Sequence, residues 1–122
     1  GPMAHLGSLE RAVMNVLWEG DDPLSVRDVQ DRLEDQDLAY TTVMTVLDRL
    51  LTKQMVHRER DGRAFRYSPA LTRDAATAEV LNAALDDAGP DRTAALVHFA
   101  RTVDPAEAAA LRDALDDILG RG

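Results

Sequence analysis

Hydrophobic residues recur at helical spacing near the start of the chain and predict a helix over residues 9–18. Four of them fall on one helical face, namely Leu9, Val13, Val16 and Leu17. Ser8 precedes this pattern as the expected N-cap, and the Gly-Asp-Asp-Pro run at residues 20–23 ends it. A single apolar face indicates a helix that packs against a core.

Two further helices follow, joined by a short connection. Ser25 and Asp28 have the spacing of a capping box, so Ser25 is expected to begin the second helix. This helix ends around residues 35–37, and the third runs from about residue 40 to residue 54. The inner face of the third helix carries Val43, Val46, Leu47 and Leu50, and its outer face carries Thr41, Thr45, Asp48 and Thr52.

Two alternating runs, residues 55–60 and 63–68, predict a β-hairpin. Asp61 and Gly62 lie between them, and an Asp-Gly pair favours a tight turn with positive φ at both positions. Three helices followed by a hairpin is the order of a winged helix-turn-helix. In that arrangement the third helix is the recognition helix, which enters the DNA major groove.

The rest of the chain predicts three more helices, at residues 72–87, at 92–103 and from Pro105 to about residue 119. Asp104, Pro105 and Glu107 together form a strong helix start. These helices carry more apolar surface than a winged domain needs, which favours a homodimer interface. The alternative is that they fold back on their own chain. The residues expected at the interface are Leu96, Phe99, Leu111, Leu115, Ile118 and Leu119.

The predicted fold class is therefore mainly α with a small β-hairpin wing. A winged-helix DNA-binding domain is expected at residues 3–70, and a C-terminal helical dimerisation domain at residues 71–122. The 45% of residues that are hydrophobic suffice for a packed core.

Charge is distributed unevenly along the chain. The net charge of −8 argues against a nucleic-acid partner, but residues 40–68 hold six basic and three acidic side chains, a local +3. Residues 71–122 hold five arginines and ten acids, a local −5. A local basic segment can contact phosphate although the whole protein is acidic.

Composition excludes several other classes. The chain has no cysteine, so it has no disulfide and no zinc–thiolate site. Its three histidines are scattered, and no nucleophile–base pair or phosphate-binding glycine loop is present, so neither a metal, a cofactor nor an enzymatic activity is expected. No apolar run is long enough to span a membrane, which favours a cytoplasmic protein without direct membrane association.

The outer face of the third helix and the hairpin carry the candidate DNA chemistry. Threonine hydroxyls can bond base edges or phosphates, Met44 can pack on a thymine methyl group, and Arg49 and Lys53 can reach the backbone. Arginines also decorate the hairpin, and Arg63 lies at its tip. The alternatives are an ordinary solvated helix in a protein-interaction module without sequence-specific DNA binding, and a hairpin whose edge is merely protected by charge.

Three segments of the sequence resemble the BlaI/MecI penicillinase-repressor family. They are residues 9–18 (LERAVMNVLW), residues 40–50 (YTTVMTVLDRL) and residues 62–69 (GRAFRYSP). Together with Leu111-Arg112-Asp113, the resemblance covers nearly the whole chain. The sequence of the recognition helix resembles that of the actinobacterial branch.

This resemblance implies a homodimeric repressor that binds double-stranded dyad operators of β-lactamase or related antibiotic-resistance genes. It implies that Thr41, Thr42, Met44, Thr45 and Arg49 are recognition-helix contacts, and that Lys53 and Arg63 contact phosphates. The full candidate DNA-binding set is Tyr40, Thr41, Thr42, Met44, Thr45, Arg49, Lys53 and Arg63.

The resemblance also suggests how repression is relieved. In the staphylococcal members a membrane sensor protease cleaves the repressor at an Asn-Phe pair. The matching helix here reads Leu96-Val97-His98-Phe99-Ala100, so the corresponding pair is His98-Phe99. A copper-responsive branch carries a cysteine cluster, which this chain lacks.

Overall fold

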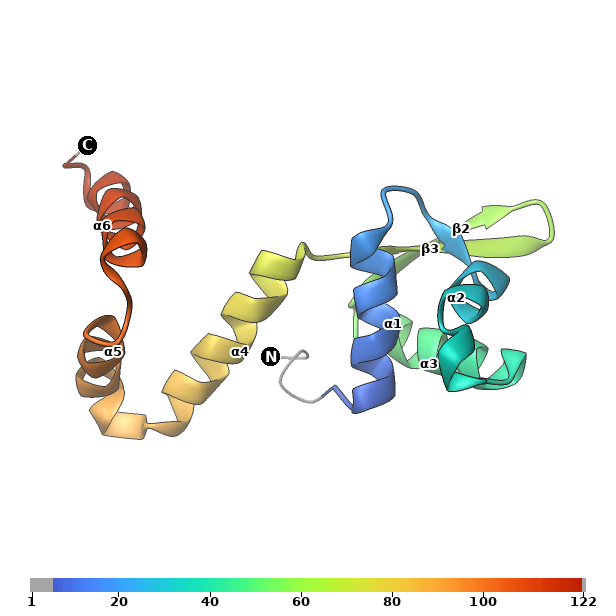
Figure 1. Ribbon diagram of the computed structural model, residues 1–122, viewed down its shortest axis with the longest axis horizontal. Helices are drawn as coiled ribbons and strands as arrows, with labels where there is room; N and C mark the ends of the chain where they lie inside the picture. Colours follow the sequence, from blue (N-terminus) through green and yellow to red (C-terminus); the bar gives the residue numbers. More distant parts are fainter. Residues whose placement is uncertain (1–5, 122) are drawn as a thin grey trace. The chain divides into compact units, whose positions relative to one another are not determined.

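The computed structural model describes residues 6–121, so residues 3–5 of the predicted winged domain lie outside the described part. The chain consists of two compact units, of which the first reaches to Ala83 and the second begins at Ala84 (Figure 1). This division is based on contacts and does not test the functional boundary expected after residue 70, which stays a prediction.

Three helices build the first unit: α1 (Ser8–Glu19), α2 (Val26–Arg32) and α3 (Tyr40–Thr52), with a 3-10 turn, η2 (Glu34–Gln36), after α2. Their apolar faces meet in one core, as the spacing predicts. Its largest fully buried side chains are Met14, Leu17, Leu47, Leu50, Met55, Val13, Val29 and Val43.

The expected start of α2 is confirmed, but α1 begins one residue earlier than expected. The Ser25 hydroxyl accepts a hydrogen bond from the Asp28 amide at 3.1 Å, and the Asp28 carboxylate accepts one from the Ser25 amide at 3.0 Å. At α1, Ser8 is already helical and Gly7 is the N-cap. The reason is that Glu10 reaches back to accept the Gly7 amide at 3.2 Å.

The wing is a small antiparallel sheet with the strand order β1-β3-β2. It consists of β1 (Leu24–Ser25), β2 (Val56–Asp61) and β3 (Ala64–Pro69). The hairpin is confirmed, but its turn was predicted one residue too early. Asp61 pairs with Ala64, so Gly62 and Arg63 form the two-residue loop. Of these two residues only Gly62 has a positive φ, 65°, and glycine at the first loop position is typical of a type II′ turn.

The beginning of α4 (Arg73–Asp87) belongs to the first unit. Ala76 is fully buried against the core, and Val80 packs on it. The indole of Trp18 donates a hydrogen bond to the Leu71 carbonyl at 2.9 Å, and the Arg73 guanidinium lies 5.2 Å from the indole ring. Trp18 therefore packs at the edge of the core and fixes the position of the segment that leads into α4.

The second unit contains the end of α4, a 3-10 turn, η3 (Gly89–Asp91), and the helices α5 (Arg92–Ala100) and α6 (Pro105–Leu119). Asp104 caps α6 as expected, since its carboxylate accepts the Glu107 amide at 2.8 Å. Neither α5 nor α6, both described in full, has a buried residue. Their large apolar side chains are exposed, up to 79% for Ile118.

Candidate nucleic-acid interface

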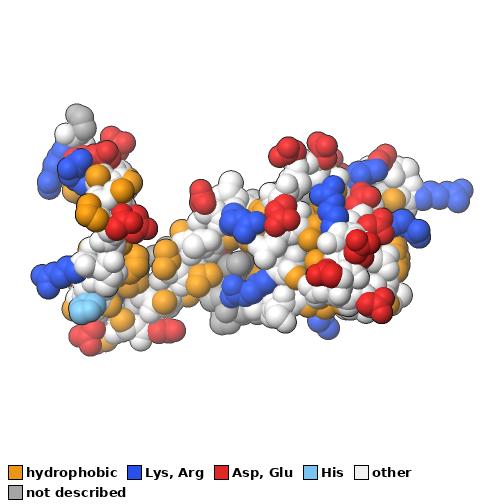
Figure 2. Space-filling view, viewed as in Figure 1, with side chains coloured by type: hydrophobic (Ala, Val, Ile, Leu, Met, Phe, Trp, Pro, Cys, Tyr) orange, Lys and Arg blue, Asp and Glu red, His pale blue; other side chains and the backbone are white. Residues whose placement is uncertain are grey.

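A groove of about 640 Å³ lies between the outward face of α3, the start of α2 and the wing. Apolar side chains, mainly Met44, Phe65 and Tyr67, line part of it. Its charged lining consists of Arg27, Arg58, Arg63, Arg66 and Asp48. Four arginines and one aspartate make this groove a basic concavity, and in Figure 2 basic side chains project from the wing.

The core packing of α3 decides which of its residues reach the groove. Val43, Val46, Leu47 and Leu50 are buried, so the opposite side of α3 faces outward. Tyr40 and Met44 are exposed and line the groove together with Arg63 from the wing. The structure thus brings these three predicted site residues together.

Other predicted contacts lie on the second flank of α3, toward α1. A shallow depression there is lined by Thr41, Thr42, Thr45 and Arg49, together with Leu9 and Val46. Thr42 is only half-exposed, whereas Thr41, Thr45 and Arg49 are exposed. The predicted set therefore covers two flanks of one helix, both on its outward side.

Two threonines on the outer face of α3, Thr45 and Thr52, have hydroxyl protons that are already engaged. The Thr45 hydroxyl donates to the Thr41 carbonyl at 2.9 Å, and the Thr52 hydroxyl donates to the Asp48 carbonyl at 3.1 Å. A hydroxyl bonded to the preceding helical turn keeps its lone pairs. Thr45 therefore presents an acceptor and a methyl group to whatever approaches α3.

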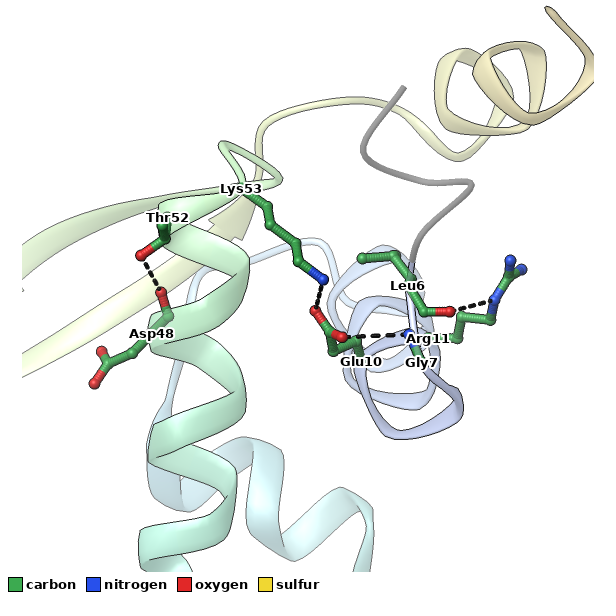
Figure 3. Close-up of polar contacts among 7 residues, drawn as sticks. All are labelled: Leu6, Gly7, Glu10, Arg11, Asp48, Thr52 and Lys53. Carbon is green, nitrogen blue, oxygen red and sulfur yellow. Dashed lines mark hydrogen bonds and ion pairs between the residues drawn. The ribbon is translucent and has the colours of Figure 1, made fainter. Parts of the chain in front are cut away.

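Lys53 has an ionic partner within the protein. Its Nζ lies 2.7 Å from the Glu10 Oε2, and the side chains are 33% and 12% exposed respectively (Figure 3). Burial acts to raise the pKa of Glu10, but hydrogen bonds from Lys53 and Gly7 and the charges of Lys53 and Arg49 together lower it. The pair fastens the end of α3 to the start of α1. The predicted phosphate contact of Lys53 would have to share its ammonium with this pair.

The arginines of the wing differ in how firmly they are held. Arg66 donates to Asp61 at 2.7 Å and lies 3.5 Å from Asp28, so both of its neighbours are acids. Arg58 stacks on Phe65, with its Cζ 4.0 Å from the ring centroid. Arg63 has no acidic partner among the described residues and projects from the turn.

Sequence reasoning did not single out Arg27, Arg58 or Asp48 as site residues. Arg27 lies two residues after the Ser25 cap, in the first turn of α2, and the first helix of a helix-turn-helix crosses the DNA backbone. That rule could have placed Arg27 at the groove. Arg58 shares a face of the hairpin with Phe65 and Tyr67 because Arg58 pairs with Tyr67, and the strand alternation contains this signal.

Two further properties concern the described residues 6–121. No three metal-ligating side chains gather there in a way that could hold an ion. None of the helices in that range is both long enough and apolar enough to cross a bilayer.

Comparison with known proteins gives a consistent result. The profile of a family described as penicillinase repressor matches residues 6–117. The transcriptional regulator BlaI of Mycobacterium tuberculosis, in two strains, is 49% identical over 120 residues, which cover 95% of this chain and 86% of that protein.

Solved structures share the fold. The solution structure of the DNA-binding domain of the repressor BlaI has 25% sequence identity and a TM-score of 0.52, and the match covers 58% of this chain and 87% of that one. The complex structure of hsRosR-S1 has 22% identity and a TM-score of 0.54, and it covers 91% of this chain and 99% of that one. The second likeness concerns the fold alone.

Proposed function

Because this chain belongs to the penicillinase repressor family, we propose that it represses transcription as a homodimer on a palindromic operator, with one copy on each half-site. The chain is a winged-helix DNA-binding transcriptional regulator. The genes expected under its control are those of a β-lactamase or a related antibiotic resistance. Its activity is binding, with no catalytic step assigned to any residue, and its place of action is the cytoplasm, where the operator is.

The observation that supports this proposal most directly is the basic groove beside α3. A recognition helix enters the major groove with its outward face, and a wing beside it contacts the flanking backbone. Tyr40, Thr41, Thr42, Met44, Thr45 and Arg49 are proposed as the contacts of α3, with Arg63 at a phosphate or the minor groove. Lys53 is proposed as a phosphate contact that also pairs with Glu10.

The homodimer is proposed from the exposed apolar surface of the second unit. In Figure 2 hydrophobic side chains lie on the surface of the C-terminal helices. A contiguous exposed apolar surface larger than a few hundred Å² is typical of an interaction site. The residues proposed to be covered by a second copy are Leu96, Phe99, Leu111, Leu115, Ile118 and Leu119, all of which are exposed in the single chain.

The most detailed part of the proposal concerns how the operator is released. A membrane sensor protease is proposed to cleave the chain between His98 and Phe99. Both side chains are exposed, but the bond lies within α5. Proteases act on extended backbone, so α5 would have to open locally before cleavage.

The test is a fluorescence-anisotropy titration of the full chain against a β-lactamase-type dyad duplex and a scrambled duplex, each at two salt concentrations. Tight binding that prefers the dyad is expected, with log K falling by about 0.9 per phosphate contact for each log unit of salt. Weak binding without preference would contradict the proposal for this operator. Salt-independent behaviour would favour the protein-interaction alternative.

Arg49→Ala sharpens the same experiment, because Arg49 is expected to meet phosphate rather than a base. The variant should weaken binding to the dyad and the scrambled duplex by a similar factor and reduce the salt slope by about 1. If variant and parent bind with equal affinity at moderate salt, Arg49 does not contribute to the DNA interface.

A further inference from the structure

Asp48 is the one acidic side chain among the described residues that line the basic groove. It lies on the outer face of α3, one turn after Met44, and its side chain is 58% exposed. An acid at this place opposes the approach of DNA phosphates and weakens binding unless the carboxylate has a partner on the DNA. Its position therefore needs a chemical reason.

Among residues 6–121, no partner neutralises Asp48 tightly. The nearest cation is Arg58, whose Nη1 lies 3.8 Å from the Asp48 Oδ1, longer than a hydrogen bond. Arg58 is held in place by its stacking on Phe65 at 4.0 Å. Among the described residues, no side chain donates a hydrogen bond to either carboxylate oxygen of Asp48, so both remain available as acceptors.

The chemistry of base pairs limits what such a carboxylate can meet. In the major groove only the exocyclic amino groups of cytosine and adenine donate hydrogen bonds. Adenine places its N7 acceptor beside that amino group, where it repels a carboxylate, whereas cytosine places a carbon there. Thr45, one turn earlier on the same face, also presents an acceptor because its proton is bonded to the Thr41 carbonyl.

We propose that Asp48 is a specificity-determining residue of the operator-binding surface: its carboxylate accepts a hydrogen bond from the N4 amino group of a cytosine, and so fixes a C·G pair at one position of each half-site. This assignment rests on the proposed function of the groove. Asp48 weakens binding to DNA in general and favours the one sequence that offers the amino donor.

The experiment begins with the preferred duplex of the full chain, selected from a randomised pool and confirmed by anisotropy. Each base pair of the half-site is then replaced in turn, for the parent and for Asp48→Ala. At one C·G position the parent should lose about 5- to 150-fold in affinity on replacement, the usual worth of a specific base contact. Asp48→Ala should lose most of that discrimination while binding scrambled DNA at least as tightly as the parent.

A matched control separates base recognition from charge. Asp31→Asn removes an equal negative charge from an exposed position on α2 that does not line the groove. It should leave the preference at every position unchanged. Asp48→Asn retains an acceptor oxygen and should therefore keep part of the preference for the amino donor.

Three results would overturn the inference in distinguishable ways. An unchanged base profile together with an unchanged overall affinity in Asp48→Ala would refute it and leave the proposed function intact. A uniform gain in affinity for every duplex, with the profile unchanged, would assign Asp48 a purely repulsive role. If the parent selects no preferred duplex from the pool, both the proposed function and this inference are refuted.

Discussion

The two compact units of the chain contain similar apolar residues but place them differently. The unit that reaches to Ala83 encloses Met14, Leu17 and Leu47 completely or nearly so. The helices α5 and α6 of the other unit bury no residue, and Leu115 remains 52% exposed. Since burial of apolar surface is the main source of folding free energy, the first unit has a core of its own, whereas α5 and α6 leave their apolar side chains exposed, which supports the proposed dimer interface.

The largest expected effect comes from removing a side chain of the enclosed core. Leu47→Ala should lower the free energy of unfolding by about 2–5 kcal/mol, because Leu47 is fully buried and its loss leaves a cavity. Leu81→Ala is the matched control, the same change at a side chain that is 50% exposed and lies outside the proposed dimer interface. Urea denaturation followed by circular dichroism measures both, and equal losses in the two variants would contradict the assignment of Leu47 to the enclosed core.

The second effect tests the partner surface directly. Leu115→Asp should split the proposed homodimer, because an unpaired carboxylate buried in an apolar interface costs more than the roughly 1–3 kcal/mol that a neutral polar group costs there. Light scattering should give the mass of a single chain for this variant and twice that mass for the parent. A variant that stays dimeric would exclude this part of α6 from the interface.

The ion pair between Glu10 and Lys53 provides an intermediate effect confined to the first unit. Glu10→Gln should lower its stability by about 1.5–3 kcal/mol at pH 7, the range of a hydrogen bond to a charged group. The pKa of folded Glu10 lies below its ordinary value of 4.5, so the ionised form contributes fully above pH 4.5. As pH falls through the folded pKa, that contribution is lost.

Denaturation of parent and Glu10→Gln at pH 7 and at pH 3 therefore checks the sign of the effect. The difference between them should shrink at the lower pH. Glu19→Gln, at an exposed position of the same helix, controls for the change in net charge. A difference that grew on acidification would contradict the assigned shift.

The smallest effect concerns how helices end in the two units. After α3, the chain turns at Gln54, which has a φ of 63°. After α6, the C-cap residue Gly120 has a φ of 74°. Glycine adopts this left-handed conformation without the strain that a Cβ adds, so Gln54→Gly should stabilise the first unit by up to about 1 kcal/mol. Gln36→Gly, where φ is not positive, should destabilise it. Thermal unfolding measures both variants.

The sequence allowed much of this architecture to be predicted because its signals are local. Helical spacing identified the inward residues of α1 and α3, and the Ser25–Asp28 and Asp104–Glu107 boxes marked two helix starts correctly. The turn was predicted one residue too early because Gly62 is suitable either as the second residue of an Asp-Gly loop or as the first residue of a Gly-Arg loop. The two-residue strand β1 is too short to show any alternation.

The features that escaped prediction depend on residues far apart in the chain. The pairing of Lys53 with Glu10 joins positions 43 residues apart, and no periodicity reports it. The same is true of the groove, which needs the wing to lie beside α3 before Arg27, Arg58 and Asp48 can share one surface. Sequence patterns identified the elements but not which charges meet when the elements pack.

The bond between Trp18 and the segment before α4 gives the protein a built-in optical probe. Trp18 is the chain's only tryptophan, its indole donates to the Leu71 carbonyl, and the Arg73 cation lies 5.2 Å from its ring. Indole emission depends on hydrogen bonding and on nearby charge. The colour and intensity of the intrinsic fluorescence therefore report, without any label, whether the start of α4 stays docked when DNA binds.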